Sequence, residues 1–565
     1  MIDVPLWLVP TVPMVLVLAL CISSLRPYVY ALVPFASIPA LLVALAGPSP
    51  APMRLDWLLL GTDLAVTETA KSFLVFTSLL WGLAGWQLIR MLADHPAQNR
   101  TTLCFLFAMT GNLGLLVAQD MAAFYTFFAM MSLASWGLVL HGGGVAQTFA
   151  GRVYIAFAVA GEVALFAGLS IGAFATNDLQ LAAMADEAVP LLATVLVSIG
   201  FLVKLGAVPF HLWLPLAHAA APAPASAVLS GAMLKAGLFG LITVLPLGQT
   251  AMPEVAVAFA AMALAGLILA PILGLVQGDP KAVLAYSSIG QMSLILLGLA
   301  AALAAPETWP LIGPALVVLA LHHAFAKAAL FLGVPAIWSV KPGTLRIAVL
   351  VLFALPALAL AGMPGTSGWL AKDALKTGLE NAPLGWKIWL GSALFLASLG
   401  TALLMLRAIF LLAKTAYKPE ISYDVALPWL AMTAFVIVGL AVAGLTPTTA
   451  NVASLTDFLP LVTAGLLAAL AAVIFSRASI RLEPAAPGEL LGMMRDVPLP
   501  ETVKARKPSK KARALVTRRS VVELLRPEYG ALATLCVAVA LALFMALMPA
   551  AEPVAPSPPI VENAQ

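Results

Sequence analysis

Residues 189–209 read VPLLATVLVSIGFLVKLGAVP, an apolar run that carries Lys204 near its end and is followed at once by Gly206 and Pro209. A helix that crosses the hydrocarbon core of a bilayer needs about 20 apolar residues, and this run has that length. A charged side chain at the bilayer centre costs at least ~2.5–3.5 kcal/mol, so such residues mark functional positions by default. The stretch therefore predicts a broken membrane helix that carries a functional lysine.

Runs of this kind recur along the 565-residue chain, which is 62% hydrophobic and 10% charged, with a mean hydropathy of +1.02. Soluble domains carry about 25% charged residues, so a soluble protein is excluded. The pattern predicts an all-α, polytopic membrane protein of about sixteen transmembrane helices. The expected spans are 5–24, 28–47, 71–91, 102–118, 121–140, 152–175, 189–209, 226–247, 254–276, 283–304, 310–338, 345–370, 387–412, 427–446, 457–476 and 528–549.

Charged residues in the loops alternate in sign along the chain. Loops after odd-numbered spans carry the basic residues Arg26, Arg90, Arg100, Arg152, Lys281, Lys341, Arg346, Lys414 and Lys418. Loops after even-numbered spans carry the acidic residues Asp56, Asp63, Glu68, Asp120, Asp178, Asp186, Glu187, Glu254, Glu307 and Asp457. Basic loops stay in the cytoplasm, so the alternation predicts a multi-pass protein of the plasma (inner) membrane with both termini outside the cytoplasm.

The C-terminal part has a different composition. Residues 477–527 are rich in lysine and arginine and form a basic cytoplasmic connection to the last helix, 528–550. Two interpretations stay open for this connection: a helix on the membrane surface that straps its neighbours, or a flexible basic linker beside anionic lipid. The proline-rich tail, 551–565, is expected to be disordered. The three cysteines form no CxxC pair, so neither an iron–sulfur nor a zinc site is expected.

Several ionisable residues fall inside the expected spans or, for Lys372, just after the twelfth span. They are Glu162, Lys204, Lys235, His322, His323, Lys327 and Lys372. Burial lowers the pKa of a lysine and raises that of a carboxylic acid, and histidine titrates near neutral pH, so a row of such groups can pass a proton. The alternative for any one lysine is that it extends to the membrane surface, and this alternative is strongest for Lys372. Because these residues lie on separate helices, their combined presence favours ion transport.

Two of the expected helices are interrupted by glycine and proline, the seventh at Gly206–Pro209 and the twelfth at Gly362–Gly368. Paired interruptions point to internal inverted repeats with transport sites at the breaks. A repeat of five helices inserts its second copy upside down, so spans 4–8 and 9–13 are the expected repeats, with Lys204 and Lys372 as corresponding residues. The predicted units are N-terminal helices in 1–100, repeats in 101–250 and 251–415, and further helices in 416–476.

Six short motifs surround these residues. They are KLGAVPFHLWLPLAH at 204–218, APAPASA at 221–227, MLKAGLFG at 233–240, DPKAVLAYSSI at 279–289, HAFAKAALFL at 323–332 and GMPGTSGWLAKD at 362–373. They closely resemble the core of the antiporter-like, proton-translocating subunits of respiratory complex I, Mrp cation/proton antiporters and membrane-bound hydrogenases. The resemblance covers roughly residues 100–415. The sequence around His218 most resembles that of the hydrogenase-4 and formate hydrogenlyase branch.

The resemblance implies a role for each matched residue. Lys204 would be the channel lysine of the first half, and Lys235 would connect the two halves. His323 and Lys327 would form the relay of the second half, and Lys372 would be the terminal exit residue. In such assemblies redox chemistry in partner subunits drives proton movement, so no cofactor is expected in this chain.

The sequence departs from the family pattern at one position. Relatives usually carry a glutamate in the fifth span that pairs with the first channel lysine, and Ala129 stands at that place. Glu162, one span later, matches a place where some members carry a carboxylate. The hypothesis is that Glu162 replaces the missing partner of Lys204, and the alternative is an altered or inactive first half-channel.

The main functional hypothesis is a proton-translocating membrane subunit of a complex-I-like redox pump of the NADH dehydrogenase or hydrogenase type. The alternatives are a subunit of a Mrp-type sodium/proton antiporter, a membrane partner of an inorganic-carbon uptake complex, and a scaffold that no longer pumps. The expected partners are other membrane subunits, redox subunits and the lipid bilayer, with no nucleic acid. The retained lysines argue against the scaffold, and the scarcity of acidic residues in the core argues weakly against sodium, which prefers oxygen ligands.

Overall fold

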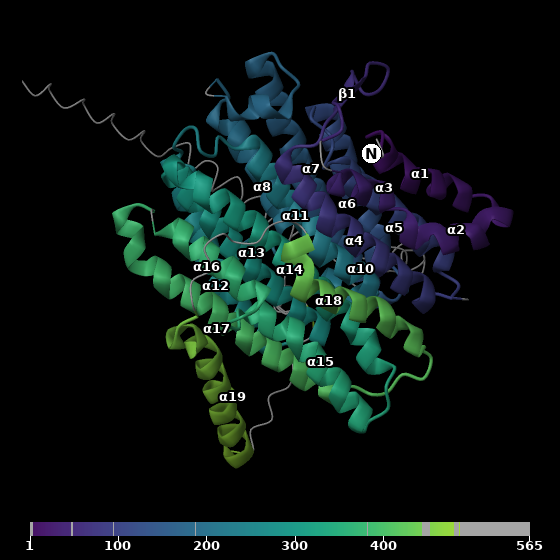
Figure 1. Ribbon diagram of the computed structural model, residues 1–565, viewed down its shortest axis with the longest axis vertical. Helices are drawn as coiled ribbons and strands as arrows, with labels where there is room; N and C mark the ends of the chain where they lie inside the picture. Colours follow the sequence, from purple (N-terminus) through teal and green to yellow (C-terminus); the bar gives the residue numbers. More distant parts are fainter. Residues whose placement is uncertain are drawn as a thin grey trace, which may run out of the picture.

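The computed structural model describes residues 4–46, 49–93, 95–186, 188–380, 382–442 and 453–478, together with residues 485 and 487. Within these ranges the chain is a bundle of helices (Figure 1), and its strands form one two-stranded hairpin. Eleven helical segments there are long and apolar enough to cross a membrane, and shorter apolar helices accompany them. The prediction of an all-α, polytopic membrane protein is therefore confirmed.

The N-terminal helices lie against one side of the bundle. They are α1 (Leu8–Leu20), α2 (Arg26–Leu32), α3 (Ile38–Leu45) and α4 (Glu68–Met91). Proline lies in the first turn of both α2 and α3, where its missing N–H group has no helical partner to lose. Thr67 caps α4, because its side chain accepts a hydrogen bond from Ala70 N. The helix α4 packs against α14 in the centre of the bundle.

The first group of core helices covers the predicted first repeat. It contains α5 (Gln98–Gly114), α6 (Met121–Val139), α7 (Val145–Thr176), α8 (Leu191–Leu205), α9 (Trp213–Ala220), α10 (Ala223–Val228) and α11 (Leu234–Val244). A π-helical turn at Leu229–Met233 joins α10 to α11 within one span. The helix α8 ends at Gly206, whose φ of +72° is the left-handed conformation that glycine adopts without strain.

The second group covers the predicted second repeat. It contains α12 (Pro253–Leu275), α13 (Pro280–Ala304), α14 (Trp309–Trp338), α15 (Thr344–Ala361), α16 (Ser367–Leu379) and α17 (Leu384–Lys414). Gly362 ends α15 with a φ of +89°, and Thr366 caps α16. Both helix interruptions therefore occur where the glycines and prolines predicted them.

The two groups share an order of packing partners. The helix α5 packs on α6 as α12 packs on α13, and α7 contacts α8 and α9 as α14 contacts α15 and α16. Likewise, α8 packs on α11 as α15 packs on α17. The five-helix repeats and their inverted relation stay predictions.

The remaining described helices follow the second group. They are α18 (Ala426–Val442), which packs on α14 and α4, and α19 (Leu459–Ala478), which packs on α17 at one edge of the bundle (Figure 1). The predicted last helix, 528–550, and the tail, 551–565, lie outside the described residues, as does nearly all of 477–527. The count of sixteen spans therefore stays a prediction.

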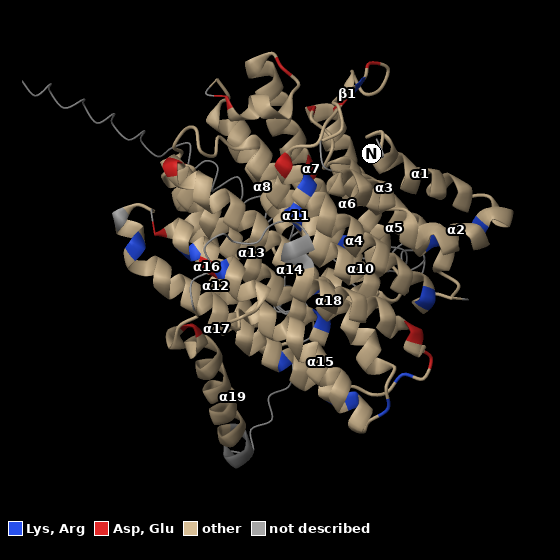
Figure 2. Cartoon of the chain, in the orientation of Figure 1, with Lys and Arg blue, Asp and Glu red and all other residues tan. Residues whose placement is uncertain are grey.

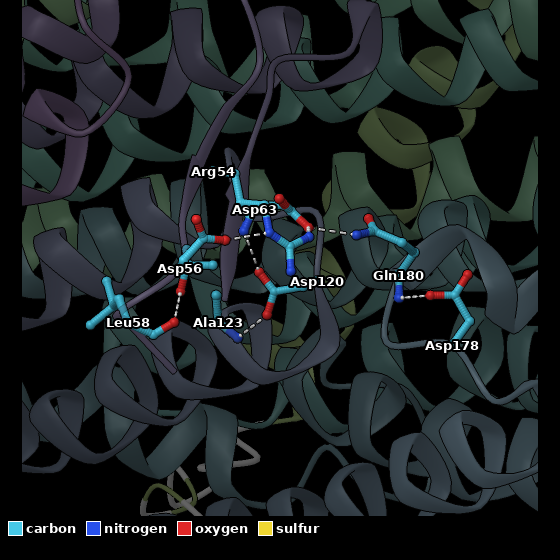
Figure 3. Close-up of polar contacts among 9 residues, drawn as sticks. Arg54, Asp56, Leu58, Asp63, Asp120, Ala123, Asp178 and Gln180 are labelled. Atoms are coloured by element: carbon cyan, nitrogen blue, oxygen red, sulfur yellow. Dashed lines mark hydrogen bonds and ion pairs between the residues drawn. The ribbon is translucent and has the colours of Figure 1, made fainter. Parts of the chain in front are cut away.

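Charged residues avoid most of the helical surface and gather near helix ends and in connecting loops (Figure 2). One such group holds a hairpin against the core helices (Figure 3). Arg54 pairs with Asp56 at 2.8 Å and with Asp63 at 3.2 Å. Asp63 N donates to Asp120 Oδ2, and Gln180 Nε2 donates to Asp63 Oδ2. The hairpin strands are β1 (Met53–Leu55) and β2 (Thr62–Leu64).

Close helix packing in the first group depends on Gly111 of α5. A Cβ atom placed there would lie 2.4 Å from Phe127 O and 2.5 Å from Met131 N on α6. Small residues let membrane helices approach so closely. We expect Gly111→Ala to lower stability by about 1–3 kcal/mol, as overpacking does. Thermal unfolding in detergent measures this, and Gly465→Ala is the control, since a Cβ at Gly465 meets no atom within 4 Å. Equal melting temperatures for the two variants would contradict the tight contact.

Candidate functional site

The Lys204 ammonium group lies at the junction of α6, α7 and α8. Its Nζ donates to Ser132 Oγ at 2.9 Å and to the Tyr154 hydroxyl at 3.5 Å. It also lies 5.8 Å from the centre of the Phe128 ring. Only 6% of Lys204 is exposed. A buried charge is costly unless hydrogen bonds or an opposite charge compensate it, so this lysine needs the polar groups around it.

Glu162 of α7 lines the same cavity as Lys204 and Ser132. The cavity of about 10 Å³ is large enough for about one water molecule. Glu162 and Lys204 are not in direct contact, because no ion pair within 4.0 Å joins them in the described structure. Ser132, which accepts a hydrogen bond from Lys204, lines the cavity together with Glu162. This placement meets the requirement of the hypothesis that Glu162 serves as partner of Lys204, and the role itself stays a prediction.

The break between α8 and α9 is closed by the first residue of α9. Trp213 Nε1 donates to Val203 O at 3.0 Å, and the Trp213 ring packs edge-on against Tyr154. Non-helical backbone within a membrane is tolerated only where protein surrounds it or water lines it. Trp213 supplies that cover, and it holds the end of α8, with Lys204, beside α7.

Lys235 and His323 meet in the centre of the bundle. Lys235 Nζ lies 2.5 Å from His323 Nδ1 and donates to Ser230 O at 2.6 Å. Both side chains are fully buried. Ser230 belongs to the π-helical turn that precedes Lys235. Such turns leave backbone carbonyl groups free of the regular helical ladder and are frequent at functional sites. Here a carbonyl of that turn holds the lysine.

Lys327 lies one turn after His323 on α14 and bonds to α13. Its Nζ donates to Leu284 O at 2.5 Å and also to Ser287 Oγ. The next residue on α13, Ser288, shares a hydrogen bond of 2.8 Å with Ser230 Oγ. Polar groups of α11, α13 and α14 therefore form one buried cluster. The sequence placed His323 and Lys327 on one helix face, and the structure shows that they bond to different neighbouring helices.

A further group of contacts surrounds the second break. His322 Nδ1 lies 2.9 Å from Ser367 Oγ at the start of α16. Lys372 Nζ lies 3.0 Å from Ala361 O, 3.3 Å from Leu360 O and 3.1 Å from Ser398 Oγ. These carbonyls are the last of α15, where a helix has free acceptors and the negative end of its dipole. A cation is stabilised there.

The structure corrects the proposed correspondence of Lys204 with Lys372. Lys204 precedes its break, as part of the last turn of α8, whereas Lys372 follows its break, within α16. The two are therefore not at equivalent chain positions. Each ammonium group nevertheless lies near the end of the helix that precedes its own break, since Lys372 reaches back to the end of α15.

Two histidines of the first break were not selected from the sequence. His218 is fully buried, stacks on Phe331 at 4.8 Å and lies within electrostatic range of Lys235, Lys281 and Lys327. Neither ring nitrogen of His218 or His211 has a hydrogen-bond partner among the described residues. Buried polar atoms without partners need an explanation, and water at a transport site is one. The signal was present, because both histidines stand in the motif at 204–218.

Comparison with known proteins agrees with this arrangement. Residues 118–399 match the family described as NADH:quinone oxidoreductase/Mrp antiporter, TM. The chain is 30% identical to NADH-quinone oxidoreductase subunit N of Desulforudis audaxviator (strain MP104C) over 378 residues, which covers 62% of this chain and 72% of that protein. It is 29% identical to NAD(P)H-quinone oxidoreductase chain 4 1 of Picosynechococcus sp., covering 58% of this chain and 65% of that one.

Hydrogenase-4 component B of Escherichia coli (strain K12) is 30% identical, over 48% of this chain and 43% of its own length. Identity thus does not favour the hydrogenase branch over the quinone oxidoreductases. The chain spans less than two thirds of the length of two of these three relatives.

Solved structures share the fold. The Mrp complex from Dietzia sp. DQ12-45-1b matches with a TM-score of 0.61 at 20% identity, over 78% of this chain and 94% of that chain. The archaeal membrane-bound sulfane sulfur reductase matches with a TM-score of 0.63 at 19% identity, over 81% and 96% of the respective chains. From its sequence relatives and its fold, this multi-pass membrane protein belongs to the NADH:quinone oxidoreductase/Mrp antiporter transmembrane family.

Proposed function

We propose that the chain is a proton-translocating membrane subunit of a complex-I-like, redox-driven pump in the inner membrane. The observation that carries the proposal is the buried contact between Lys235 and His323. Burying ionisable groups in a membrane bundle is costly, and no carboxylate forms an ion pair with either group in the described structure, so a functional role explains their presence. A histidine ring can accept a proton at one nitrogen and release it at the other.

The remaining residues extend the pathway on both sides. Lys204 with Glu162 forms the first half-channel, Lys327 continues the relay, and Lys372 is the exit. Because these groups form separate clusters, water is required between them. Lysines held next to one another respond to each other's charge, so a change at one cluster shifts proton affinity at the next.

Partners and cofactors follow from this proposal. Other membrane subunits bind alongside this chain, and the redox subunits, with any electron-transferring cofactor, belong to the rest of the assembly. In this proposal the chain itself binds no cofactor. The relatives named above are described as subunits, chains or components, which supports membership of a larger complex. The alternation of loop charges supports an orientation with both termini outside the cytoplasm.

Purification of the tagged chain in mild detergent tests the proposal. We expect iron–sulfur or nickel proteins to copurify, and metal analysis to find the corresponding metals. A complex of membrane subunits without redox metal, active as a sodium-dependent proton exchanger, would contradict redox drive and support a Mrp-type antiporter. A single soluble zinc protein as partner would support inorganic-carbon uptake instead.

A further inference from the structure

A cavity of about 430 Å³ lies between α16, α17 and the start of α19, which is within the size range of ligand sites. One part of its wall is charged, with equal numbers of lysines and acidic residues. These are Lys372, Lys376, Lys387, Asp373, Glu380 and Asp457. Figure 2 shows basic and acidic segments close together around α16. Another part is apolar and includes Trp369, Leu390, Leu394 and Phe395. The cavity is therefore amphipathic and electrically balanced.

The outer charged residues of this cavity, Lys387 and Asp457, stand at helix starts. Lys387 stands in the first turn of α17, between Trp386 and Trp389, whose ring centres are 5.5 Å apart. Tryptophans gather where membrane helices enter the interface. Asp457 lies just before α19, also at a helix start. In the described structure Lys376 and Lys387 form no ion pair within 4.0 Å, so their charges are available.

The apolar part of the cavity follows α17 onward from Lys387. Leu390, Leu394 and Ser398 are spaced four residues apart, so they line one face of the helix. The helix α19 closes the other side, and it touches its neighbours through small residues, with Ala464 packed beside Ala361 and Ala402. Only 6% of the apolar window Leu455–Ile474, which contains most of α19, is buried, so this edge of the bundle is exposed within the described chain.

From this combination we infer that the cavity binds one phospholipid with a zwitterionic aminoethyl phosphate headgroup, such as phosphatidylethanolamine. Lys376 and Lys387 bind the phosphate, and Glu380 and Asp457 accept hydrogen bonds from the ammonium group. One acyl chain lies along Leu390 and Leu394. Basic pockets between membrane helices bind lipid headgroups in this way, and the carboxylates add the selectivity for an amine. The inference does not rest on the proposed function, although Lys372 of the proposed proton pathway lines the inner end of the cavity.

The test measures lipid binding to the purified, delipidated complex by native mass spectrometry. Dioleoyl-phosphatidylethanolamine is titrated, with the phosphatidylcholine and phosphatidylglycerol forms as comparisons. We expect Lys376→Gln with Lys387→Gln to weaken binding of phosphatidylethanolamine by at least about tenfold, because each lysine contributes attraction to the phosphate. The matched control is Lys341→Gln with Lys414→Gln, which removes the same charge outside the cavity. Equal loss in both double variants would overturn the site.

A second variant fills the cavity without changing charge. A Cβ atom at Gly391 meets nothing within 4 Å, and Gly391 lines the cavity, so Gly391→Trp occupies the lipid volume without a clash at its base. We expect it to remove one bound lipid. Gly385→Trp is its control, because Gly385 is equally open but does not line the cavity. Unchanged lipid number in Gly391→Trp would overturn the proposal. Equal affinity for phosphatidylglycerol would overturn the role of the carboxylates.

Discussion

Lys235→Met is expected to reduce proton translocation by at least about 100-fold, the lower range for removal of a proton-transferring group. Methionine keeps most of the volume of the lysine but removes the ammonium group that contacts His323 and Ser230. His323 then loses its hydrogen-bonded neighbour, and the path between the halves is interrupted. The measurement is the ratio of protons moved per electron transferred in proteoliposomes that contain the whole complex, with a pH-sensitive dye inside the vesicles.

The control for this prediction removes a lysine outside the pathway. Lys71→Met also deletes one positive charge from a helix, but Lys71 pairs with Glu68 in the first turn of α4. The complex with Lys71→Met should therefore translocate protons normally. If Lys235 and His323 act as one unit, His323→Gln should have a comparable effect, and the double variant should be little worse than either single one. Normal pumping by Lys235→Met would remove the basis of the proposed function.

Glu162→Gln is expected to reduce coupled translocation by at least about tenfold, and Glu162→Asp much less. The carboxyl group lines the same cavity as Lys204 and Ser132, and Ser132 accepts a hydrogen bond from Lys204. Glutamine fills the same space but cannot become negative, so a charged Lys204 loses the carboxylate that compensates it. The same vesicle assay reports the result.

A restored carboxylate distinguishes replacement of the family glutamate from a merely structural role. Ala129 lies on α6, three residues before Ser132, where relatives are expected to carry glutamate. In the Glu162→Gln background, Ala129→Glu should recover part of the activity. A double variant as inactive as Glu162→Gln alone would mean that position 129 cannot supply the partner. Unchanged pumping by Glu162→Gln would mean that Lys204 needs none.

Much of the fold was predictable because membrane helices have a required length and composition. The breaks at Gly206 and Gly362 were also predictable, because left-handed backbone conformation favours glycine and ends a helix. The buried ionisable residues were found from the cost of charge in lipid. These signals are local properties of the sequence.

Tertiary contacts were harder to predict. Spacing along α14 placed His323 and Lys327 on one face, but it could not show that one bonds to α11 and the other to α13. The sequence also gave no sign that Lys372 reaches back to the carbonyls of α15, which requires the three-dimensional path of the break. Ser132 was missed because a serine in a membrane helix most often bonds to its own backbone, as Ser135 does.

The adjacent histidines of α14 have a mechanical consequence. Neighbouring residues on a helix point about 100° apart, so His323 faces Lys235 on α11 while His322 faces Ser367 on α16. A rotation of α14 about its own axis would move both imidazole rings at the same time. When His323 moves away from Lys235, His322 would then move relative to Ser367 as well. The helix α14 would in this way couple the site at Lys235 mechanically to the site at Ser367.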